Sequence, residues 1–145
     1  MPGTTSGRPQ GYLQITVSDG VYAVWWSKYT HNWIRPVTYI NRYVDPTWTT
    51  FLPTPPFPEY TSGHSVQSGA AAEVLTATFG SRPFTDHTHD GLGLPARSFE
   101  SFDDMAAEAA LSRLYGGIHY RSAIERGLAQ GRTIGMTVAA LPLTG

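Results

Sequence analysis

Apolar residues recur at helical spacing in four stretches of the chain, and clusters of glycine and proline separate these stretches. No stretch alternates apolar and polar residues as a half-buried strand does, and no internal repeat is present. The pattern therefore predicts an all-α fold, a helical bundle with about four main helices. The expected helices run from Asp19 to about Ile34, from His64 or Ser65 to Phe79, from Ser101 to Gly116, and from Ile118 to Val138.

The segments between and within these helices carry their own signals. Pro36 stops the first helix, and the proline-dense segment 45–58 predicts an extended connector. Ser101 stands three residues before Asp104, as in a capping box. The last helix has glycine at every fourth position (Gly127, Gly131 and Gly135), so we expect it to pack closely on a neighbouring helix. The domain organisation expected is a loose leader over 1–18 and a single helical domain over 19–145.

Composition limits the function classes. Charged residues make up 14% of the 145 residues, below the roughly 25% of an average soluble domain, and Lys28 is the sole lysine beside nine arginines. The net charge of −1 argues against nucleic-acid binding. No apolar run reaches the ~18 residues of a membrane span, and no signal peptide is visible, so we expect a soluble protein of unknown localisation. The absence of cysteine excludes a disulfide scaffold.

Two short stretches contain residue types that bind a tetrahedral oxyanion. Lys28 and Arg35 are seven residues apart, which on a continuous helix would place both cations on one face. Ser62, Gly63 and His64 stand at the predicted start of a helix, where free N–H groups favour an anion. Taken alone, the cations could be a solvated face and Ser62 a helix N-cap.

A third stretch places Arg113 and His119 on either side of a Gly-Gly turn, which could aim both at one point. Together the stretches form the pattern Lys-x6-Arg-Pro, Ser-Gly-His and Ser-Arg-x5-His. This pattern resembles the superfamily that joins type 2 phosphatidic acid phosphatases, bacterial class A acid phosphatases and vanadium-dependent haloperoxidases. The resemblance extends from about Asp19 to Val138. It is closest to bacterial vanadium haloperoxidase-like proteins around residues 55–65 and 112–121.

The resemblance implies a helical bundle of the vanadium haloperoxidase and acid phosphatase type around one bound oxyanion. In a haloperoxidase, His119 would coordinate the vanadium of bound vanadate, whereas in a phosphatase it would attack phosphorus. His64 would serve as the general acid and base in both reactions. The residues implied to bind vanadate or phosphate are Lys28, Arg35, Ser62, Gly63, Arg113 and His119.

Two aromatic residues favour the haloperoxidase branch. Trp25 lies three residues before Lys28, and Phe57 lies five residues before Ser62, at positions resembling the apolar halide pocket of the chloroperoxidase type. Ordinary core or cleft packing is the alternative for both. The segment Asp86–Asp90 has metal-ligand residue types, but their spacing matches no known site, so we expect solvated turn residues there.

The chain departs from the family pattern at one residue that bears on the chemistry. Phosphatases of the superfamily continue His-x3-Asp, and the Asp orients the nucleophilic histidine, but Ala123 stands at that position here. Glu125 would point elsewhere on a helix, and a backbone carbonyl could also orient His119. The departure weakens the phosphatase interpretation more than the vanadate one.

The second departure is length, because the family usually places several helices before the Lys-x6-Arg-Pro segment. An apolar surface meant for those helices would then be exposed, which predicts a fragment, a homo-oligomer or a marginally stable minimal version. The leading hypothesis is a vanadate-dependent enzyme that oxidises halide with hydrogen peroxide. The alternatives are a metal-independent acid phosphatase acting on phosphate monoesters, and a truncated remnant that binds an oxyanion without turnover.

Overall fold

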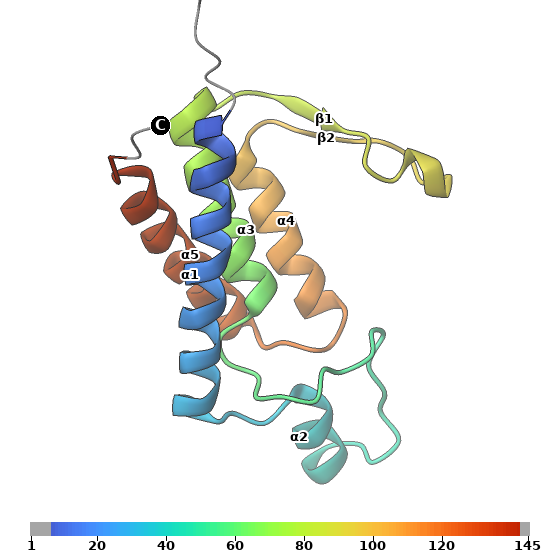
Figure 1. Ribbon diagram of the computed structural model, residues 1–145. Helices are drawn as coiled ribbons and strands as arrows, with labels where there is room; N and C mark the ends of the chain where they lie inside the picture. Colours follow the sequence, from blue (N-terminus) through green and yellow to red (C-terminus); the bar gives the residue numbers. More distant parts are fainter. Residues whose placement is uncertain (1–6, 143–145) are drawn as a thin grey trace, which may run out of the picture.

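Four long α-helices form a bundle, and a short helix lies at one end of it (Figure 1). This computed structural model describes residues 7–142, and it confirms the predicted all-α bundle. Helix α3 lies at the centre and packs against α1, α4 and α5. The helices are α1 (Gly7–His31), α2 (Pro36–Tyr43), α3 (Gly63–Phe79), α4 (Phe102–Tyr115) and α5 (Arg121–Ala139).

Small residues let α3 and α5 approach closely. A Cβ atom added at Gly131 of α5 would collide with the carbonyl of Val66 on α3, so only glycine fits this contact. The buried apolar side chains of α3, α4 and α5 are mostly alanine and valine, which suits such short separations. The predicted close packing of the glycine face is therefore confirmed, and it occurs within the chain.

Helix α1 differs from its predicted limits at both ends. It begins at Gly7, so Asp19 lies inside the helix and does not cap it; residues 1–6 of the predicted leader lie outside the described residues. Tertiary contact explains the extension, because the Tyr12 hydroxyl donates to the Leu141 carbonyl at 2.7 Å. The helix ends at His31 because Asn32 adopts a left-handed conformation, with φ of 50°.

The early end of α1 separates the two cations that the sequence placed on one helix. Pro36 does not stop α1; it starts α2, where its missing N–H costs no hydrogen bond. Arg35 is therefore the N-cap residue of α2, while Lys28 lies in the last turn of α1. The predicted helical face shared by Lys28 and Arg35 is wrong, and their proximity needs another cause.

Of the two long segments that connect helices, one agrees with the sequence prediction and the other does not. The connector between α2 and α3 contains no helix or strand, as its prolines predict. The segment between α3 and α4, where no strand was predicted, contains β1 (Phe84–Asp86), a 3-10 turn (Asp90–Leu92) and β2 (Arg97–Phe99), and the two strands pair in antiparallel fashion. Three-residue strands are too short to show alternation in a sequence, which is why they were missed. Figure 1 shows this hairpin projecting from the bundle.

Aromatic side chains lie exposed on α1, as expected if helices of longer relatives pack there. Tyr22, Trp26 and Tyr29 recur at i, i+4 and i+7 and are 76%, 69% and 65% exposed. The oligomer and the fragment stay predictions. Within residues 7–142, no helix is long and apolar enough to cross a membrane, and no group of three or more His, Cys, Asp or Glu could hold a metal ion.

Candidate oxyanion site

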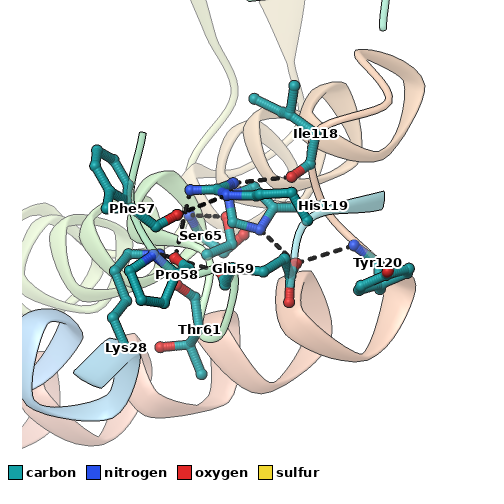
Figure 2. A network of polar contacts seen from close by, with 11 residues as sticks. Lys28, Phe57, Pro58, Glu59, Thr61, Ser65, Ile118, His119 and Tyr120 are labelled. Carbon is teal, nitrogen blue, oxygen red and sulfur yellow. Dashed lines mark hydrogen bonds and ion pairs between the residues drawn. The ribbon is translucent and has the colours of Figure 1, made fainter. Parts of the chain in front are cut away.

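The buried side chain of Lys28 ties α1 to the end of the proline-rich connector. Its ammonium donates to the carbonyls of Pro58, Glu59 and Thr61, at 3.0, 3.1 and 2.8 Å (Figure 2). An ammonium has three N–H donors, so these carbonyls use all of them. Burial, and then the charge of Arg35, lower the pKa of Lys28 to about 8, whereas Glu59 opposes that shift.

Arg35 reaches the same connector from the start of α2. Its Nε donates to the Phe57 carbonyl at 2.9 Å, and its Nη1 donates to the Ile118 carbonyl at 2.8 Å. Nη1 also lies 3.2 Å from Nε2 of His119. Burial lowers the pKa of Arg35 below its usual value. The connector, rather than a common helix face, therefore brings Lys28 and Arg35 together.

His119 follows the turn between α4 and α5, where Gly117 has the positive φ of 74° that the turn requires. The imidazole is 5% exposed, and its Nδ1 lies 2.6 Å from Oε1 of Glu59. Burial lowers the pKa of His119, with Arg35 and Lys28 adding to the effect, and the hydrogen bond and charge of Glu59 oppose it. Figure 2 shows Glu59 and His119 pointing toward each other.

Glu59 is the functional candidate that the sequence reasoning missed. It is fully buried, and its Oε1 also accepts a hydrogen bond from the Tyr120 amide at 3.0 Å. Its one visible signal was that it is the sole acid between Asp45 and Glu73. Glu125, considered in its place, is exposed and lies 3.9 Å from Arg121.

A second group lies where α3 begins and α4 ends. Ser62 is the N-cap of α3, its Oγ accepting from the Ser65 amide at 3.4 Å, and Gly63 is the first residue of the helix. Arg113, in the last turn of α4, has Nη1 3.4 Å from Nε2 of His64. Partial desolvation of the imidazole, and then the positive charge of Arg113, lower the pKa of His64, although the residue is exposed.

The two aromatic residues assigned to a halide pocket lie together beside Lys28. The rings of Trp25 and Phe57 meet edge to face with centroids 5.0 Å apart, and the Lys28 ammonium lies 5.1 Å from the Phe57 ring centre. With Gly63 and other residues they line a cavity of about 140 Å³. The cavity thus adjoins both the buried lysine and the start of α3.

The donor set fits an anion. Lys28 and Arg35 are buried together, and one carboxylate, Glu59, accompanies them, while Arg113 stands at the neighbouring helix end. The positive charge of Arg35 disfavours the charged form of Lys28 and, after burial, is a cause of its lowered pKa. A bound oxyanion would relieve this repulsion. The arrangement is chemically suited to an oxyanion.

Comparison with protein families identifies the family to which this helical bundle belongs. The family model described as the VCPO second helical-bundle domain matches residues 43–142. The chain belongs to this family of vanadium-dependent haloperoxidases. No curated protein sequence matches it.

Solved structures agree with the family. The structure of a bacterial vanadium-dependent iodoperoxidase is 53% identical, with a TM-score of 0.86, over 90% of this chain and 32% of that one. Holo and apo structures of a bacterial vanadium-dependent chloroperoxidase are 19% and 20% identical and share the fold, with TM-scores of 0.74 and 0.69; they cover 88% and 83% of this chain. The chain spans about a third of the length of these structures.

Proposed function

We propose that this chain binds vanadate and oxidises halide with hydrogen peroxide. The observation that carries the proposal is the buried cation pair Lys28 and Arg35 beside a histidine whose Nε2 faces Arg35. The 53% identity to the bacterial iodoperoxidase supports the same activity. Vanadate, when bound, supplies the Lewis-acidic centre at which peroxide becomes reactive toward halide.

The residues around that centre take distinct roles. Arg35 and Arg113 donate hydrogen bonds to the oxyanion, assisted by Ser62 and the Gly63 amide at the start of α3. Lys28 contributes its positive charge, because backbone carbonyls occupy its donors. His119 would hold the bound vanadate through Nε2. These residues together replace the hydration shell of the anion with fixed donors.

Proton transfer falls to His64. Its ring is accessible from solvent at the helix start, and its lowered pKa favours the neutral form, so it would accept or deliver a proton beside the bound oxyanion. Trp25 and Phe57 provide the apolar wall that strips water from an approaching halide. Halide and peroxide are the expected small-molecule partners.

A metal-independent acid phosphatase is the second candidate, and one contact favours it. The sequence lacks the expected orienting Asp at Ala123, but Glu59 places a carboxylate on His119 Nδ1. An oriented His119 could attack phosphorus through Nε2 while the ester P–O bond breaks and His64 protonates the departing alkoxide; water would then release phosphate.

One assay separates these functions. The purified chain is given peroxide and iodide, bromide or chloride, with and without vanadate, and in parallel an aryl phosphate. We expect halide oxidation that requires vanadate. Aryl phosphate hydrolysis that vanadate inhibits would select the phosphatase instead. Oxyanion binding by calorimetry with neither activity would select the non-catalytic remnant.

A further inference from the structure

The hydrogen bonds of His119 define where its proton sits. An arginine has no acceptor, so the 3.2 Å contact from Arg35 Nη1 requires a lone pair on His119 Nε2. Oε1 of Glu59 accepts from the Tyr120 amide at 3.0 Å, so it acts as an acceptor, and its 2.6 Å contact with Nδ1 requires the proton on that nitrogen. Both contacts select the same neutral tautomer of His119.

Glu59 is itself held at several points, which makes it a rigid partner. Its amide donates to the Trp33 carbonyl at 2.9 Å, and its own carbonyl accepts from Lys28 at 3.1 Å. Oε1 accepts from both the Tyr120 amide and His119. The carboxylate therefore fixes both the ring of His119 and the backbone at Tyr120 by hydrogen bonds.

Burial of this carboxylate is costly, which argues against an incidental contact. Glu59 is 0% exposed, and its Oε2 has no hydrogen-bond partner within the described residues. A buried carboxylate with an unpaired oxygen destabilises a fold unless its other oxygen makes strong contacts. Ala123 carries no carboxylate, and Glu125 is turned to solvent beside Arg121, so neither substitutes for it.

From these contacts we propose that Glu59 is the positioning residue of His119. Glu59 holds the proton on Nδ1 and the ring in place, so that the Nε2 lone pair faces the oxyanion-binding cations. This inference rests on the proposed function, because a fixed direction of the Nε2 lone pair has a functional use only if His119 binds the oxyanion. Glu59 lies 60 positions before His119 in the chain. It takes the orienting role that the family pattern gives to an Asp at the position of Ala123.

Nitrogen NMR of the free protein tests the tautomer directly. In ¹⁵N-histidine-labelled wild type at a fixed pH near 7, His119 is assigned by its disappearance in His119→Gln. We expect a protonated Nδ1 and an unprotonated Nε2. A protonated Nε2 with an unprotonated Nδ1 in the wild type would overturn the proposal. The measurement uses the wild-type protein, so it does not depend on whether a Glu59 variant folds.

The isosteric Glu59→Gln variant tests the consequence. An amide can accept from or donate to Nδ1, so a population with protonated Nε2 should appear, and vanadate affinity by calorimetry should fall about 10- to 100-fold. Glu125→Gln is the matched control and should change neither reading. Glu59→Gln with wild-type tautomer and affinity would refute the positioning role.

The two proposals fail in distinguishable ways. A wild-type chain that oxidises no halide contradicts the haloperoxidase proposal, yet its His119 tautomer still decides the role of Glu59. A chain that oxidises halide normally but has Nε2 protonated contradicts only the role of Glu59.

Discussion

The two histidines of the site lie in opposite environments. His119 is 5% exposed and is held between Glu59 on Nδ1 and Arg35 on Nε2. His64 is exposed on the first turn of α3, and its ring Nε2 lies 3.4 Å from Nη1 of Arg113. The imidazole of His119 is therefore enclosed by two partners, whereas that of His64 is open to solvent.

Under the proposed function, this difference gives the two histidines different roles. A ligand or nucleophile needs a lone pair in a constant direction, which a buried carboxylate partner supplies. A general acid and base must gain and lose its proton within each turnover, which an accessible ring beside a cation permits. The site thus divides into a rigid half around His119 and a proton-exchanging half around His64.

Removal of the His64 side chain should cause the largest loss of turnover and leave vanadate binding nearly unchanged. We expect His64→Ala to lower kcat for halide oxidation about 10²- to 10⁴-fold, because general acid–base catalysis contributes that much. Vanadate affinity should stay within a few-fold of wild type. His87→Ala, in the exposed hairpin, serves as the control and should be unaffected. Equal losses of affinity and turnover in His64→Ala would erase the distinction between the two halves.

The rigid half should also matter more for stability. Lys28→Met keeps the aliphatic length but leaves three connector carbonyls without their donor, so we expect a loss of about 3 kcal/mol in the free energy of unfolding. Arg113→Met should cost less than about 1 kcal/mol, because Arg113 is only part-buried and contacts side chains at the mouth of the site. Urea unfolding followed by circular dichroism measures both. Similar losses for the two variants would contradict the comparison.

The aromatic wall should affect halide use more weakly. Trp25→Ala opens the cavity beside Phe57, and we expect KM for halide to rise several-fold, with kcat changed less, because a partly exposed apolar contact contributes about 1 kcal/mol. Trp25→Phe keeps an aromatic face and should restore most of the loss. An unchanged KM in Trp25→Ala would show that halide binds elsewhere.

The smallest expected effect is a shift in the titration of His64. Burial and then the Arg113 charge disfavour the imidazolium, so the pKa of His64 is lowered from its usual value in the wild type. Arg113→Gln removes the positive charge, and the pKa should move up toward its usual value. Proton NMR of the His64 ring across pH 4–8 follows the pKa in wild type and in Arg113→Gln. A downward shift in Arg113→Gln would contradict the assigned contact.

Local signals in the sequence predicted much of this architecture. The caps at Ser62 and Ser101, the glycine face of α5 and the proline connector depend on neighbouring residues, and the structure has each of them.

The rest depended on contacts between distant segments. The start of α1 at Gly7 is supported by contact between Tyr12 and Leu141, which no local pattern encodes. Lys28 and Arg35 meet through the connector rather than through helical spacing. Glu59 and His119 are separated by 60 positions, so the search for an orienting carboxylate close to His119 could not find it.

Vanadate titration by calorimetry tests the central claim most directly, that the fixed imidazole of His119 is the oxyanion ligand. Wild type, His64→Ala and His119→Ala are compared at pH 7, with circular dichroism to establish that each is folded. We predict that His64→Ala binds vanadate nearly as wild type does and that His119→Ala loses binding by about 100-fold or more. Wild-type affinity in a folded His119→Ala would contradict the account.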